Sequence, residues 1–214
     1  MRDMAKVSID FVKNVFRILR ADLASLGFEK RTRGILTITV SSDVLGWLGL
    51  NIATRGQKDF IEINPVIGVR NQRIEKLIAG ILGERFDEVI PPTLTKSIGY
   101  LTPENRYISY NFSSRNPPEP VAASLIASVG KFGLPFIERH VEMATLVNSL
   151  RTGKFSIPFM VAYRVPAGLY LLGQNKDAIS YLNAELVKIG DRDDPAATRF
   201  KSFARKFAEV CREH

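Results

Sequence analysis

The sequence is poor in the residue types that usually carry catalysis or bind metals. Its 214 residues include one cysteine, Cys211, two histidines and one tryptophan. A single cysteine excludes an intramolecular disulfide bond and gives no reason to expect an oxidising compartment. There is also no phosphate-binding glycine loop, no nucleophile elbow and no pair of metal ligands at helical spacing. We therefore predict no cofactor, no metal site, no catalytic residue and a cytoplasmic location.

Long apolar runs and blocks of charge are missing as well. No segment approaches the roughly 18 consecutive apolar residues of a membrane span, and the first residues are charged, unlike a signal peptide. Lysine and arginine number 30 against 22 acidic residues, a net charge of +8, but no five basic residues occur in a row. A hydrophobic content of 45% suffices for a core. The composition predicts a basic globular protein that attracts phosphates or acidic protein surfaces.

The first predicted element is a helix with a basic face. Apolar residues recur at spacings of three and four between Met4 and Leu26, and Gly27 ends the pattern. The opposite side of the helix carries a basic stripe made of Lys6, Lys13, Arg17 and Arg20. Such a stripe is usually a solvated helix face, and the alternative is a binding surface.

Apolar residues then alternate with polar ones, which is typical of strands. Three runs, at 36–40, 48–53 and 61–69, are separated by short breaks that suit antiparallel turns. Residues 28–33 add a possible leading strand. Pro65 predicts that the third run has a bulge or lies at a sheet edge, because proline cannot donate to a strand ladder.

A helix over 72–82 and two further strands, at 97–101 and 107–112, complete the predicted first lobe, with a turn at 102–105. The two strands carry aromatic residues with arginines beside them, and this set could stack nucleobases between cations. Cross-strand packing in the sheet is the ordinary explanation for such aromatics. The set consists of Tyr100, Tyr107, Tyr110, Phe112, Arg106 and Arg115.

The proline-rich segment 113–120 is the clearest predicted boundary, because three of its residues are prolines that cannot continue a strand. We predict an α+β lobe with an antiparallel sheet over 1–112 and a helical lobe over 121–214 that packs on it. Residues 162–189 resemble one tetratricopeptide-like helical hairpin, in which a small residue at Gly168 lets the two helices approach closely. Another helix is predicted through Phe136, His140 and Leu150, and Asp194 with Pro195 begins the last one.

Few residues are candidates for chemistry. His140 lacks partners one helical turn away and is predicted to be a structural histidine. The carboxylates of Asp191, Asp193 and Asp194 could bind a cation, but capping of the following helix explains them better. Glu62 and Asn64 invite comparison with metal-dependent nucleases, although asparagine stands where those enzymes have lysine.

Four segments carry a family resemblance. They are Leu26-Gly27-Phe28, the strand run 34–40, the strand end 51–57 and the strand 60–64. Together they resemble a family of bacterial domains of unknown function that combine a leading helix with an antiparallel meander. The resemblance covers about the first 110 residues. It implies a related fold, and some members of that family are suspected immunity proteins encoded near polymorphic toxins.

The leading functional hypothesis is a non-enzymatic bacterial protein that recognises a protein partner, of immunity or neutralising type. A binder needs only an exposed face, whereas a catalyst needs a convergent polar cluster. The alternative is a nucleic-acid-associated accessory protein with weak, non-specific binding, and a small hydrolase or nuclease is the remote alternative. We expect no membrane partner, and the sequence leaves the oligomeric state open. The candidate binding surface comprises Lys6, Lys13, Arg17, Arg20, Arg106, Tyr107 and Arg115.

Overall fold

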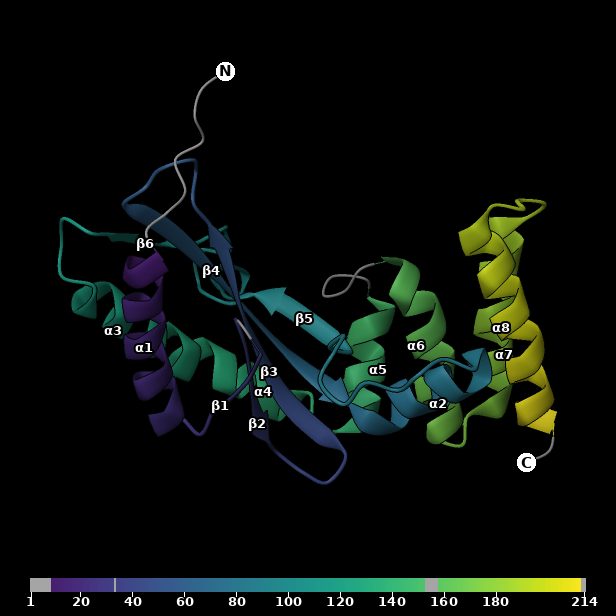
Figure 1. Ribbon diagram of the computed structural model, residues 1–214. Coiled ribbons are helices and arrows are strands. Elements are labelled where there is room, and N and C mark those ends of the chain that lie inside the picture. The colour runs from purple at the N-terminus through teal and green to yellow at the C-terminus, as the bar shows by residue number, and fades with distance from the viewer. Residues whose placement is uncertain (1–8, 33, 153–157, 213–214) are drawn as a thin grey trace, which may run out of the picture. The chain divides into compact units, whose positions relative to one another are not determined.

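The computed structural model describes residues 9–32, 34–152 and 158–212. The predicted α+β class is confirmed: an N-terminal helix precedes an antiparallel sheet, which has six strands in the described residues, and a helical C-terminal part follows (Figure 1). The elements in chain order are α1 (Ile9–Ser25), β1 (Glu29–Thr32), β2 (Ile35–Thr39), β3 (Val44–Ala53), β4 (Phe60–Asn71), α2 (Gln72–Leu82), β5 (Leu94–Ser97), the 3-10 turn η1 (Ile98–Tyr100), β6 (Tyr110–Ser113), α3 (Glu119–Ser128), the π-helical turn η2 (Val129–Gly133), α4 (Leu134–Arg139), α5 (Met143–Arg151), α6 (Pro158–Leu171), α7 (Asn175–Ile189) and α8 (Pro195–Arg212).

The sheet has the order β1-β2-β3-β4-β5, and β6 also pairs with β4. Strand β4 therefore has neighbours on both sides, and the prediction that Pro65 marks an edge strand is wrong. The pairing between β4 and β6 runs from Phe60 opposite Ser113 to Ile63 opposite Tyr110. It ends before Pro65, so the missing N–H group of the proline is not needed in this ladder.

The predicted strands at 97–101 and 107–112 are shifted in the structure. Strand β5 already ends at Ser97, because the next residues curl into the turn η1. The carbonyl of Gly99 accepts hydrogen bonds from the backbone of Arg106, at 3.2 Å, and from the hydroxyl of Thr102, at 2.9 Å. A Cβ atom at Gly99 would lie only 2.3 Å from the carbonyl oxygen of Arg106, so glycine is required at this close approach.

Helix ends follow capping chemistry where the sequence predicted it. Helix α2 has the predicted bounds, since the Asn71 side chain accepts from the Ile74 N–H and Gly83 closes the helix with a left-handed φ of 69°. Asp194 caps α8 in the same way by accepting from the N–H groups of Ala196 and Ala197 at 3.2 Å. The predicted positions of these helix ends are confirmed.

The single helix predicted through residues 136–150 is wrong. Helix α4 ends at Arg139, and α5 begins at Met143, because the Glu142 carboxylate accepts from the N–H groups of Ala144 and Thr145 and starts a new helix. The predicted role of Gly168 is corrected too. A Cβ atom there would meet Val147 of α5 at 2.3 Å, so this glycine allows α6 to approach α5 and not α7.

The contacts divide the chain into two compact units. Among the described residues, one contains 9–69 together with 95–139, and the other contains 70–94 together with 140–212. This division differs from the predicted boundary at 113–120, because η2 packs on the sheet: a Cβ atom at Gly133 would lie 3.1 Å from Ile67. Helix α2 in turn belongs with the later helices. Packing of the predicted helical lobe on the first lobe stays a prediction.

Candidate functional site

The structure separates the predicted basic stripe into different environments. Lys6 lies outside the described residues. Arg17 is exposed and donates to the side-chain oxygen of Asn14 at 3.0 Å. Lys13 and Arg20 instead line a groove together with Lys30 of β1, a residue that sequence reasoning missed. The helical spacing revealed the first two cations, but only the fold brings Lys30 beside them.

The predicted aromatic and arginine surface is divided as well. Tyr110 and Phe112 are buried, whereas Tyr107 is half exposed and its hydroxyl donates to Glu62 at 2.8 Å. Arg106 does not take part in that contact and instead lines a separate groove, which is described next. Arg115 lies in an exposed turn, where its backbone N–H donates to the Ser113 hydroxyl at 3.3 Å. These residues do not form one continuous stacking surface.

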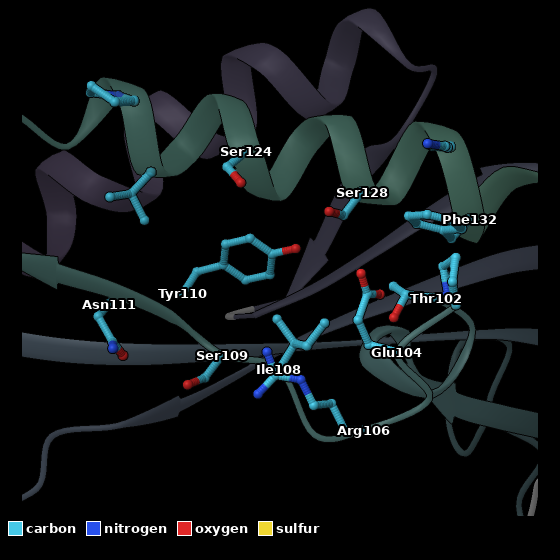
Figure 2. A pocket seen from close by; sticks show the side chains of 14 residues that line it. Thr102, Glu104, Arg106, Ile108, Ser109, Tyr110, Asn111, Ser124, Ser128 and Phe132 are labelled. Carbon is cyan, nitrogen blue, oxygen red and sulfur yellow. The ribbon is translucent and has the colours of Figure 1, made fainter.

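One hollow in the sheet-containing unit is the β6 groove, with a volume of about 750 Å³ (Figure 2). One wall is the chain from Ile108 to Asn111, which leads into β6. The other wall is one side of α3 and η2, formed by Val121, Ser124, Ser128 and Phe132. In Figure 2 the ring of Tyr110 projects into the space below Ser124 and Ser128.

The β6 groove reaches the free edge of strand β6. In the described part of the chain β6 pairs with β4 alone, so its second edge has no strand beside it. Of the residues from Ile108 to Asn111 that line the groove, Tyr110 and Asn111 belong to β6. Successive side chains of a strand point to opposite faces, so a hollow above one face would be lined by only one of these two. The groove is therefore open to the strand edge itself.

The charged residues of the β6 groove are one carboxylate, Glu104, and two cations, Arg106 and Lys131. Glu104 has a pKa below its usual range, chiefly because of its contact with the Thr102 side chain, with further contributions from its own backbone N–H and from the positive charges of Arg106 and Lys131. The carboxylate is thus held in its ionised form. The rest of the groove offers the hydroxyl groups of Ser124 and Ser128 beside apolar side chains.

A buried carboxylate supports the wall of this groove from behind. Glu62 of β4 accepts from Arg55 Nε at 2.7 Å and from the Tyr107 hydroxyl at 2.8 Å. These hydrogen bonds, with Arg55 the largest contributor, lower the pKa of Glu62 to about 2, and the same contact raises the pKa of Tyr107. Asn64 donates to the carbonyl of Ile108 at 2.7 Å. Both side chains that suggested a nuclease are therefore engaged in holding residues 107–108.

A second hollow in the same unit, of about 550 Å³, is the basic groove beside α1. Its cations are Lys13, Arg20 and Lys30. Its apolar lining comes from Ile9, Val12 and Phe16 of α1 and from Ile52 at the end of β3. The guanidinium of Arg20 lies over the Phe16 ring, 5.7 Å from its centre.

The helical unit contains a buried charge cluster that sequence reasoning missed. Glu75 of α2 accepts from Arg164 Nε and from the Thr93 hydroxyl, at 2.9 and 2.7 Å, and Arg70 Nη1 lies 3.9 Å from the same carboxylate. All three charged side chains are at most 7% exposed. Arg164 stands in an otherwise apolar helix, which was the one available signal, since a charge in such a stretch needs a buried partner.

The remaining candidate residues have structural contacts. His140 is buried and shares a hydrogen bond of 2.9 Å with Ser149, consistent with the predicted structural role. Asp194 is occupied by its helix cap and by Arg192. Cys211 is half buried, and burial raises the pKa of its thiol. Within the described residues no three metal-binding side chains of the His, Cys, Asp or Glu type converge.

No protein-family model, curated protein or solved structure matches this chain. Among the described residues one helical stretch, 119–139, is long and apolar enough to cross a membrane, and 33% of its most apolar window is buried. Core helices of soluble proteins also have this length and composition, so the property by itself assigns no location.

Proposed function

We propose that this protein is a binding protein that recognises a protein partner by accepting an extended segment of it beside β6. The observation that carries this proposal is the β6 groove, in which the free edge of a strand faces a helix across a hollow of about 750 Å³. Strand addition of this kind supplies affinity through main-chain hydrogen bonds and selectivity through alternate side chains.

The other sheet edges support the choice of β6. Strand β1 is exposed along its whole length, carries Glu29, Lys30 and Arg31, and has an irregular register between Lys30 and Thr32. Charges and bulges are the features that protect an edge from pairing with another chain. Strand β5 at the other end of the order carries Lys96. By contrast, the four residues of β6, Tyr110–Ser113, include no charge.

The geometry of the groove also indicates which side chains the partner segment would present. Alternate residues of an added strand would point toward α3, where Val121 and Phe132 offer apolar contact and Ser124 and Ser128 offer hydrogen bonds. A segment of mixed apolar and polar residues fits this lining. The hydrogen bonds from Asn64 and to Glu62 hold the strand wall in place before binding, which reduces the entropy lost on association. An immunity or neutralising role is one biological setting for such recognition.

A peptide-display selection tests the proposal without knowledge of the natural partner. Random 12-residue peptides are selected on the wild-type protein and counter-selected on a filled-groove variant, Ser124→Phe with Ser128→Phe. The control is Ala123→Phe with Ala127→Phe, which adds the same rings at the same spacing on the exposed side of α3. Selected peptides should lose at least about tenfold in affinity, or about 1.4 kcal/mol, for the filled-groove variant alone.

N-methylation of alternate peptide residues then tests the strand-addition mode. It removes main-chain donors while leaving the side chains, so binding should fall when the methylated positions face β6 and change little when they face away. Failure to select any peptide, or equal affinity for the filled-groove variant, would overturn the proposal.

The alternative function, nucleic-acid association, has one supporting observation: the convergence of Lys13, Arg20 and Lys30 in the basic groove. Phosphate binding would weaken steeply as ionic strength rises, whereas strand addition to an uncharged edge would not. Fluorescence anisotropy of a labelled 20-nucleotide single strand at two salt concentrations separates the two functions.

A further inference from the structure

The cations of the basic groove are available to a ligand. Arg20 and Lys30 form no ion pair with the described residues, and Lys13 pairs only with Asp10 at 3.8 Å, where both side chains are largely exposed. Exposed pairs of this kind contribute little, because water and salt screen them. The positive potential of the groove is therefore not cancelled by the protein's own carboxylates.

A comparable hollow in the helical unit shows the opposite arrangement. It lies between α6, α7 and α8, has a volume of about 530 Å³ and also carries three cations. Each of these is matched: Lys188 with Glu185, Arg192 with Asp194 and Arg199 with Glu84, at 2.6 to 2.8 Å. Unneutralised cations thus distinguish the basic groove from another hollow of the same molecule.

The spacing of the cations in the basic groove favours an extended anion. Lys13 and Arg20 are seven residues apart on α1, which places them about 10 Å apart along the helix axis. A ligand with several negative charges along its length could contact Lys13, Arg20 and Lys30 at once.

The apolar lining of the basic groove further limits the class of ligand that would fit it. Ile9 is 69% exposed although it is a large aliphatic residue, and it lies beside Val12 and Ile52 in the groove. An inorganic anion or a sugar-phosphate backbone would leave this surface uncovered. Single-stranded nucleic acids are usually held by aromatic rings on which bases stack, and the one aromatic residue of this groove, Phe16, is 4% exposed.

From these observations we infer that the basic groove is a second docking site, which takes an acidic protein segment that carries apolar side chains. This inference rests on the proposed function in one respect, namely that the ligand is a protein. The carboxylates of the segment pair with Lys13, Arg20 and Lys30, and its apolar side chains cover Ile9 and Ile52.

Charge-matched variants of the full chain test this site. The groove variant is Lys13→Glu with Arg20→Glu and Lys30→Glu. The control variant is Arg17→Glu with Lys58→Glu and Lys176→Glu, three exposed cations outside the groove. Both variants change the net charge equally, so long-range attraction falls by the same amount in both. Circular dichroism and thermal melting establish that both are folded.

Three labelled probes are compared by fluorescence anisotropy: a 12-residue peptide alternating glutamate with leucine, one alternating glutamate with glycine, and a 12-nucleotide oligo-dT. The glutamate–leucine peptide should bind most tightly. Its affinity should fall at least tenfold for the groove variant and no more than threefold for the control variant. The inference is overturned by equal losses in both variants, by tighter binding of oligo-dT, or by no binding of the glutamate–leucine peptide.

The filled-groove variant, Ser124→Phe with Ser128→Phe, separates this inference from the proposed function. Binding of the glutamate–leucine peptide at the basic groove should be unchanged in that variant. If the peptide loses its affinity there, it binds beside β6, and the second site is overturned while strand addition is supported. If display peptides fail to bind beside β6 but the probe still depends on Lys13, Arg20 and Lys30, the proposed strand addition fails and the basic groove stands.

Discussion

Two glutamates in different units of the molecule are held by the same kinds of donor, an arginine Nε and a hydroxyl. Glu62 accepts from Arg55 and Tyr107, and Glu75 accepts from Arg164 and Thr93. Both carboxylates are nearly inaccessible, with side chains 8% and 7% exposed. Their arginines differ, because the side chain of Arg55 is 61% exposed and that of Arg164 is 4% exposed.

This difference separates two kinds of contact. We call the Glu62–Arg55 pair, whose arginine is exposed, the latch, and the buried cluster of Glu75, Arg164 and Arg70 the support. The Arg55 side chain can leave Glu62 and be solvated by water. Arg164 has no such option, because it is as inaccessible as Glu75, and a second guanidinium, that of Arg70, is buried beside them. Arg70 also donates to the backbone carbonyls of Asp87, Glu88 and Pro91. Burial lowers the pKa of both Arg70 and Arg164.

The largest expected effect follows from Glu75→Ala. The substitution leaves two buried guanidiniums with no carboxylate, and breaking a buried ionic pair from one side typically costs about 3–5 kcal/mol. Denaturant unfolding of the variant should show a loss of that size. Glu84→Ala, which removes the half-exposed carboxylate that pairs with Arg199 in the same unit, should cost less than about 1 kcal/mol. Equal losses in the two variants would contradict the distinction between the support and an exposed ion pair.

Removal of one arginine should cost less than removal of the glutamate. Arg164→Met replaces a buried guanidinium, one of whose nitrogens, Nη2, has no hydrogen-bond partner among the described residues, with an apolar side chain of similar length. Arg70 and Glu75 then remain as a pair of balanced charge. We expect a loss of about 1–3 kcal/mol in denaturant unfolding. A loss larger than that of Glu75→Ala would show that Arg164, and not Glu75, is the centre of the cluster.

The contribution of Glu62 to the free energy of unfolding should depend on pH. The folded pKa of Glu62 is about 2, below the ordinary glutamate value of 4.5, so its contribution to stability is complete above pH 4.5. That contribution is lost as pH falls from 4.5 toward 2. The difference in unfolding free energy between the wild type and Glu62→Gln should therefore be constant from pH 7 to 5 and shrink below pH 4.5. A difference that stays constant down to pH 3 would contradict the role of the ionised carboxylate.

The smallest effect is expected for Tyr107→Phe. Tyr107 is half exposed, so loss of its hydrogen bond to Glu62 should change the unfolding free energy by less than about 1 kcal/mol. The same hydrogen bond helps to lower the pKa of Glu62, so that pKa should rise in the variant. An NMR titration of the Glu62 carboxyl carbon measures the shift. An unchanged pKa would mean that the Tyr107 hydroxyl does not help to hold the carboxylate in its ionised form.

Much of the fold could be predicted from local patterns. The bounds of α2 and the start of α8 follow from capping residues next to apolar periodicity, and both signals act over a few residues of chain. The break between α4 and α5 was missed because the apolar spacing continues across it, while the Glu142 cap starts a new helix there. The shifted ends of β5 and β6 were missed because hydrogen bonds to Gly99 replace a strand ladder.

The sequence by itself determined the fold class, the basic face of α1 and the scarcity of catalytic residue types, since composition and periodicity are properties of the chain alone. Only the tertiary structure decided which polar residues act together. Glu62 lies 45 residues from Tyr107, and Glu75 lies 89 residues from Arg164. Lys30 joins Lys13 and Arg20 only because β1 is placed beside α1. Such contacts depend on the packing of distant elements, and no local spacing encodes them.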